Sequence, residues 1–312
     1  DPQTIAGCAE RAIAQCFTKF DKYEKKVLQD NDPEPLHQMR VRMRRLRSAI
    51  AAFAPVLILP KEVSDRQLGQ IARTLGKVRD WDVLQAQLDS YRPQLPAKEN
   101  KRLDKIIDRL NRDRQLDFLL LEKTIHGDSY CQLCRNLRDW LEQPTYRVAA
   151  HLTIQQVLPD LLLPLLSQLF LHPGWLMGSA ILESQTIDPS SPSLAQLRHH
   201  SEVLHDLRKQ IKRVRYQAEL FVGYYDESYL TQIEEFKRLQ DLLGHLQDRS
   251  VLQTFLQTQF KETLADRLPT LAQQLQTEEW ELWQNWRAVQ PRYLDAQFRQ
   301  TLRSQILAFN QF

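Results

Sequence analysis

The sequence has little of what sheets and tight turns are built from. Only eight of its 312 residues are glycine, and no segment of useful length alternates between apolar and polar residues as a half-buried strand does. Leucine, glutamine, arginine and alanine are abundant instead, and these residues suit helices. The composition therefore predicts an all-α protein, whose length suffices for one large core or two medium domains.

Cysteine is scarce, and the four thiols are too few for a disulfide framework in a chain of this length: Cys8, Cys16, Cys131 and Cys134. The last two form a lone CxxC pair with one histidine nearby, whereas zinc sites usually take four ligands. We predict no metal site and no cofactor. No basic leader followed by an apolar segment opens the sequence, and together these absences predict a reduced, cytoplasmic setting.

Long hydrophobic runs are also missing. The most apolar stretch, residues 152–178, is interrupted by Pro159, Asp160 and Pro164. Its uninterrupted apolar part is far shorter than the roughly 18–20 residues that a membrane-spanning helix needs. The pattern predicts a core helix and no membrane span.

Helical periodicity extends over most of the chain, and the breaks carry proline, glycine or aspartate. Residues 182–193, rich in serine and proline, are the most loop-like stretch. The helices form two sets, which predicts a first domain over 1–150 and a second over 151–312. The predicted helices are 4–28, 34–53, 62–90, 97–125, 129–142, 196–222, 227–260, 262–289 and 294–309.

The two sets share an internal repeat. LHQMRVRMRRLRSAIAAF (36–53) aligns with LHDLRKQIKRVRYQAELF (204–221) at an offset of 168 residues. TLGKVRDWDVL (74–84) aligns with LLGHLQDRSVL (242–252) at the same offset. Two motifs at one offset are the signature of a tandem duplication.

Each basic repeat carries two parallel stripes at helical spacing. The apolar stripes are predicted to face a core: Leu36, Met39, Met43, Leu46, Ile50 and Phe53, then Leu204, Leu207, Ile211, Val214, Ala218 and Phe221. Beside them run the cationic stripes His37, Arg40, Arg44 and Arg47, then His205, Arg208, Lys212 and Arg215. Arg45 and Arg213 project from a different side.

The cationic stripes admit more than one interpretation. Like charges four residues apart destabilise a helix by a few tenths of a kcal/mol per pair. One interpretation without a ligand is that the stripes are solvated faces or pair with acidic residues of neighbouring helices. Recurrence at matched register favours a shared anionic ligand. Asp80 and Asp248 are interpreted as structural, orienting an arginine or capping. Three further basic residues lie near Asp80 in the sequence and are secondary candidates for anion contact: Arg73, Lys77 and Arg79.

These motifs resemble the CHAD family, the conserved histidine α-helical domain, over about residues 4–305. The resemblance implies two four-helix bundles related by pseudo-twofold symmetry, with a basic surface and a central cavity that bind inorganic polyphosphate. Carried over by position, it assigns anion contact to His37, Arg40, Arg44, Arg45, Arg47, His205, Arg208, Lys212, Arg213 and Arg215. One departure is Gln247, where the first repeat has Arg79.

The resemblance further implies a binding protein without catalytic residues, whose partners are polyphosphate, polyphosphate granules and the enzymes of those granules. Some family members add a triphosphate-tunnel domain with an ExExK signature. The nearest string here, EWELW at 279–283, lacks the basic residue, so we expect a stand-alone module. Two alternatives stay open. One is a nucleic-acid binder, although the stripes lack interleaved aromatic residues; the other is a phosphorelay protein with His37 or His205 as phosphoacceptor.

Overall fold

The computed structural model describes residues 3–179 and 194–309, and over these ranges the backbone forms helices and no β-strand. The prediction of an all-α fold is confirmed. The predicted loop at 182–193 lies outside the described residues.

The chain divides into two compact units, residues 1–157 and 158–312. The sequence placed the boundary at 150/151, whereas the structural division falls inside helix α6 (Ile154–Phe170). We call these the first unit and the second unit, and each is described by itself.

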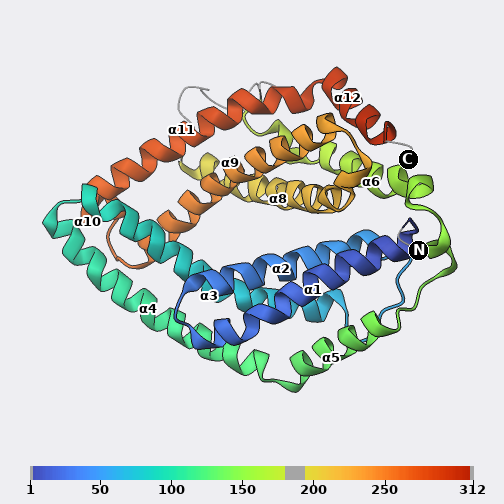
Figure 1. The fold of residues 1–312 in the computed structure, drawn as a ribbon. Helices are drawn as coiled ribbons and strands as arrows, with labels where there is room; N and C mark the ends of the chain where they lie inside the picture. Colours follow the sequence, from blue (N-terminus) through green and yellow to red (C-terminus); the bar gives the residue numbers. More distant parts are fainter. Residues whose placement is uncertain (1–2, 180–193, 310–312) are drawn as a thin grey trace. The chain divides into compact units, whose positions relative to one another are not determined.

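The described part of the first unit contains five complete α-helices. They are α1 (Ile5–Gln29), α2 (Pro33–Phe53), α3 (Asp65–Tyr91), α4 (Ala97–Ile125) and α5 (Asp128–Glu142). Helix α2 lies alongside α1 and also contacts α3, which in turn packs against α4 (Figure 1). Fully buried residues from four of these helices form the core: Phe20, Met39, Leu46, Leu75 and Leu121.

A partly buried ionic network joins three parts of the first unit. Asp30, just after α1, has a left-handed backbone conformation with φ of 49°. Arg114 of α4 donates hydrogen bonds from Nη1 and Nη2 to the two carboxylate oxygens of Asp30, at 2.7 and 2.6 Å, and from Nε to Asp82 of α3 at 2.6 Å. One guanidinium thus ties the α1–α2 turn to α3 and α4.

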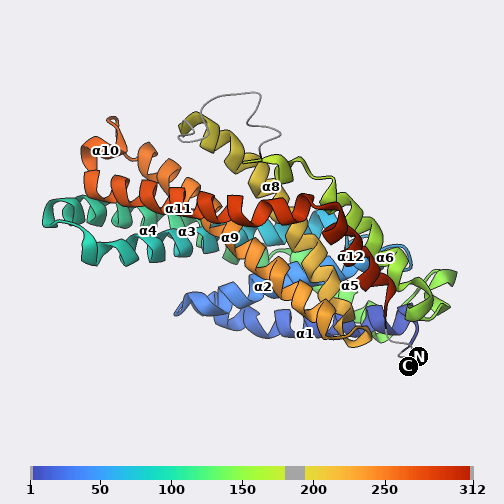
Figure 2. The same cartoon turned by 90° about the horizontal axis from the view of Figure 1, so that it is seen from above.

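The second unit contains most of α6, then α8 (Leu194–Ala218), α9 (Glu227–Thr258), α10 (Leu264–Arg267), α11 (Pro269–Leu294) and α12 (Ala296–Leu307). Helix α9 contacts both α8 and α11, as Figure 2 shows. An aromatic stack fixes the short helix η3 (Pro173–Leu176) to α11, because the Trp175 ring lies 5.9 Å from that of Trp286 and 4.6 Å from that of Tyr293, measured between centroids.

The apolar stretch 152–178 was predicted as a core helix, and residues 154–170 of it form one. This is α6, which has Pro159 and Pro164 inside it and buries Leu158, Leu162 and Leu169. Among the described residues, no helix is both long enough and apolar enough to cross a membrane.

The prediction of one helix over 262–289 was wrong at both ends. A separate turn, α10, forms because Thr263 and Asp266 make a reciprocal capping box. Leu268 then leaves the helical conformation, as a residue before proline tends to do. The next helix, α11, continues through Pro291 to Leu294, and Asp295 caps α12 by accepting a hydrogen bond from the Phe298 amide at 2.7 Å.

Candidate functional site

Helix α2 is oriented by its apolar stripe. Asp32 caps the helix by accepting a hydrogen bond from the Glu34 amide at 2.8 Å, and proline occupies the first turn. All six predicted stripe residues are buried, with at most 9% exposure: Leu36, Met39, Met43, Leu46, Ile50 and Phe53. Burial of this stripe leaves the cationic stripe at the edge of the core.

The cationic stripe of α2 faces α3. The Nη2 atom of Arg40 lies 3.9 Å from an Asp80 carboxylate oxygen, and its Nε would be 3.6 Å from a Cβ added at Gly76. Two turns further on, Arg47 donates from Nε and Nη2 to Asp65 at 3.0 and 2.8 Å. The aspartate predicted to orient an arginine is therefore beside one.

His37 lies among arginines. Burial lowers its pKa, and the positive charge of Arg79 on α3 lowers the pKa further, as do Arg44 and Arg40; Glu34 opposes this. The sequence offered Arg79 only as a secondary candidate for anion contact. Its position near His37 places it with the principal candidates. We call His37, Arg40, Arg44 and Arg79 the α2–α3 cluster.

The remaining first-unit candidates lie apart from this cluster. Arg45 faces α1, where its charge and those of Arg42 and Lys19 oppose the rise in the Cys16 pKa that burial causes. Arg73 is near Arg47, since both would approach a Cβ at Gly69 to within 3.5 Å. Lys77 is exposed on α3.

The second unit repeats the central arrangement. All six counterpart residues of the apolar stripe are buried: Leu204, Leu207, Ile211, Val214, Ala218 and Phe221. Arg208 of α8 lies against Gly244 of α9 and donates from Nε to the Gln240 carbonyl at 3.3 Å. Burial raises the pKa of Asp248, and the positive charges of Arg208 and Lys212 act against that rise. Arg208, Gly244 and Asp248 thus correspond to Arg40, Gly76 and Asp80.

The two repeats differ at the last stripe position. Arg47 is partly exposed, whereas Arg215 is buried, with 7% exposure. Arg215 donates to the Gln240 side chain at 3.1 Å and forms an ion pair with Glu219. The guanidinium of Arg215 is occupied inside the second unit. Arg213, by contrast, is exposed.

His205 is the half-buried histidine of the second cationic stripe. Burial lowers its pKa to about 4, assisted by the charges of Lys209, Arg208 and Lys212 and opposed by that of Asp206. Its Nδ1 atom is buried and has no hydrogen-bond partner among the described residues. The ring is therefore neutral at pH 7. We call His205, Arg208 and Lys212 the α8–α9 cluster.

This environment predicts a stability that depends on pH through His205. Because the folded-state pKa is below the unfolded value of about 6.5, the unfolded chain takes up a proton first as pH falls, and stability decreases between about pH 6.5 and 4. Allowing for partial solvent screening, we expect His205→Gln to remove about 1 kcal/mol of that decrease. Urea denaturation at pH 7 and pH 4.5 measures it. The exposed His151→Gln serves as control, and equal pH dependence in both variants would contradict the expectation.

Two structural contacts near the clusters were missed in the sequence. His172 accepts a hydrogen bond at Nδ1 from the Gly174 amide at 3.0 Å, so its Nε2 carries the proton and donates to Asp206 at 3.1 Å. This hydrogen bond lowers the pKa of Asp206 and fixes the segment before η3 to α8.

The second contact is that of Gly76 and Gly244 with arginine. The two glycines were aligned in the repeat, but only the structure shows that each lies against an arginine side chain.

The described residues contain no group of three or more histidine, cysteine, aspartate or glutamate side chains arranged to hold a metal ion. In the CxxC pair Cys131 is exposed, whereas Cys134 is buried and its burial raises the pKa of the thiol to about 12. The thiol of Cys134 is therefore a core group.

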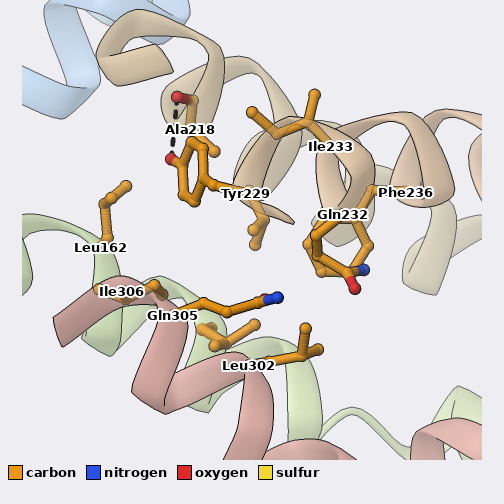
Figure 3. Close-up of a pocket in the computed structure, with 11 residues that line it drawn as sticks. Leu162, Ala218, Tyr229, Gln232, Ile233, Phe236, Leu302, Gln305 and Ile306 are labelled. Carbon is orange, nitrogen blue, oxygen red and sulfur yellow. Dashed lines mark hydrogen bonds between the residues drawn. The ribbon is translucent and has the colours of Figure 1, made fainter. Parts of the chain in front are cut away.

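A cavity in the second unit has a different character from the clusters. Figure 3 shows it lined mainly by leucine, isoleucine and aromatic side chains of α6, α9 and α12, together with the uncharged amides of Gln232 and Gln305. Tyr229 donates a hydrogen bond to the Ala218 carbonyl at 3.0 Å. Val214 and Ala218 reach it from the apolar stripe of α8. A phosphate there would lose its hydration without gaining a cation, so the cavity is not a candidate anion site.

Fold and clusters together define a class of protein, a helical tandem repeat in which each unit presents a row of cations. Comparison with family models agrees: the CHAD domain matches residues 11–257. The chain belongs to the CHAD domain family.

The solved structures that share this fold include the following two. The crystal structure of the CHAD domain from the plant Ricinus communis is 23% identical with a TM-score of 0.57, over 98% of this chain and 93% of that one. PptA from Streptomyces chartreusis is 14% identical with a TM-score of 0.54, over 90% of this chain and 99% of that one. No curated protein matches the sequence.

Proposed function

We propose that this protein binds inorganic polyphosphate, without transforming it, through the α2–α3 and α8–α9 clusters. The observation that carries the proposal is the repeated arrangement in which an arginine lies against a glycine with an aspartate beside it, Arg40 with Gly76 in one unit and Arg208 with Gly244 in the other. A solvated face tolerates almost any polar residue, whereas here the cationic residues recur at matched positions.

The chemistry of the clusters suits a polymer of phosphates. Polyphosphate carries about one negative charge per phosphate and offers no base or sugar for recognition, so a row of cations is the main requirement. Arginine grips two oxygens with its planar fork, while Lys212 supplies a flexible point charge. Neutralising several phosphates releases condensed counterions, as it does for nucleic acids, and binding should weaken steeply with salt.

The environment of the two aspartates supports the proposal of binding without catalysis. Asp80 is paired with Arg40, and Asp248 is half-buried, with the positive charges of Arg208 and Lys212 acting on it. A carboxylate engaged with a cation in this way holds the cation in place. Both are therefore assigned an orienting role, and the histidines the role of additional donors to phosphate.

The histidines make binding dependent on protons. Cationic neighbours help to keep His37 and His205 neutral in the free protein. A bound polyanion offsets that repulsion and raises both pKa values, so acid should favour the complex. In the cell, the same surface would place the protein on cytoplasmic polyphosphate granules, near the enzymes that make or degrade the polymer.

Competition between polyanions tests the proposal. Labelled polyphosphate bound to the protein is titrated with unlabelled polyphosphate, single-stranded DNA or single-stranded RNA at matched phosphate concentration and fixed salt. We expect polyphosphate to compete about tenfold better, because no aromatic residue lies within the cationic stripes to stack bases. Displacement by DNA or RNA on equal terms would instead support a nucleic-acid binder.

A further inference from the structure

One face of α9 forms a seat for the Arg208 side chain. Gln240, Gly244 and Asp248 follow one another at intervals of four residues, so they lie in a single row along the helix. Arg208 extends along this row: its Nε donates to the Gln240 carbonyl at 3.3 Å, and its charge acts on Asp248.

The guanidinium occupies the space that a side chain at residue 244 would fill. A Cβ added to Gly244 would lie 2.8 Å from Nη2 of Arg208 and 3.1 Å from both Cζ and Nε. The first distance is shorter than real Cβ contacts. Any residue other than glycine would therefore push the fork away from α9.

The same position is less tightly packed in the first unit. A Cβ at Gly76 would lie 3.6 Å from Nε of Arg40, which is an ordinary van der Waals contact. Glycine inside a helix is unfavourable compared with alanine, so a glycine in the middle of α9 needs a packing reason. At Gly244 that reason is the arginine itself.

We propose that Gly244 is a positioning residue of the anion site, whose missing side chain lets the Arg208 fork lie flat on α9 and present its donors to phosphate. This inference rests on the proposed function, because the ligand that Arg208 would grip is the one proposed above. It adds a specific requirement: the orientation of the fork matters, and charge alone does not suffice.

The test compares polyphosphate affinity in Gly244→Ala, Arg208→Ala and the double variant. The atoms in the way belong to the flexible end of Arg208, so Gly244→Ala should fold with at least wild-type resistance to urea, since alanine favours helix. We expect Gly244→Ala to weaken binding about tenfold. The slope of log affinity against log salt should decrease by the amount that corresponds to about one phosphate contact. The double variant should bind no more weakly than Arg208→Ala alone.

Further variants separate positioning from charge. Arg208→Lys leaves residue 244 untouched and keeps the charge, and we expect it to lose most of the same affinity because lysine has no planar fork. Gly76→Ala should have a smaller effect than Gly244→Ala. Gly223→Ala serves as control, since a Cβ there meets nothing within 4 Å.

The outcomes distinguish this inference from the function it rests on. If the wild type does not bind polyphosphate, the proposed function fails. If the wild type binds and Arg208→Ala weakens it, but Gly244→Ala or Arg208→Lys binds like the wild type, the positioning role is overturned and the function stands. Additive losses in the double variant would also overturn it, because Gly244 would then act by some route other than Arg208.

Discussion

Replacing Arg40 and Arg44 together with alanine is expected to weaken polyphosphate binding by about 30- to 100-fold. Each cation makes charge-assisted hydrogen bonds to phosphate, and two such losses cost about 2–3 kcal/mol after solvent screening. The slope of log affinity against log salt should fall by about 1.4–1.8, because two fewer phosphates are neutralised. Arg208→Ala/Lys212→Ala should behave alike in the second unit. Salt titrations of binding measure both quantities.

A matched control removes the same charge from elsewhere in the first unit. Lys101 and Lys105 are exposed on α4 with the same spacing of four residues, so Lys101→Ala/Lys105→Ala should change affinity less than twofold. Unchanged affinity and unchanged salt slope in both cluster variants would contradict the site assignment. Removing repelling charges four residues apart should leave the helices at least as stable, so a loss of binding would not come from unfolding.

Arg114→Ala is expected to destabilise the protein by about 3–5 kcal/mol, the largest single effect on folding that we foresee. Asp82 has only 6% of its side chain exposed and Asp30 23%, and both would lose the guanidinium that pairs with them. Removing one partner of a largely desolvated ionic network is costly because the remaining groups lose their pairing without regaining full hydration. The α1–α2 turn would also lose its connection to α4. Urea denaturation followed by circular dichroism measures the change.

Arg112 provides the comparison for Arg114. It lies two residues earlier on α4 and is exposed, so Arg112→Ala should change stability by less than about 0.5 kcal/mol. A similarly small effect of Arg114→Ala would show that the two aspartates are adequately solvated without it. Arg114→Lys should recover only part of the stability, since one ammonium cannot reach both carboxylates as the planar fork does.

Much of the fold could be predicted because helical periodicity is a local signal. The buried stripe of α2 follows from six apolar residues at spacings of three and four, and its partner in α8 follows from the repeat. The error at 262–289 arose where local signals compete. Pro291 predicted an end to the helix, but tertiary packing of α11 carries the helix past it, with Tyr293 buried against Trp175.

The candidate site could be predicted only in part. Its cationic residues lie within one stretch of sequence in each repeat, but the residues around them come from other parts of the chain. The cationic stripes are visible in the sequence, but the residues of α3 and α9 that contact them become neighbours only in the folded protein. The different environments of Arg47 and Arg215 could have been predicted from the repeat. Arg215 donates to Gln240 and pairs with Glu219. The aligned positions in the first repeat are Ala51 and Ala72, which offer no such partner.

The positions of Arg40 and Arg208 have a consequence for the entropy of the proposed polyphosphate binding. A free arginine side chain carries about 2 kcal/mol of rotamer entropy, and a ligand that must order it loses that amount from its affinity. Here the folded helices have already restricted both side chains, one beside Asp80 and one along α9. The clusters are therefore preorganised, and association should be limited by electrostatic encounter more than by rearrangement of the protein.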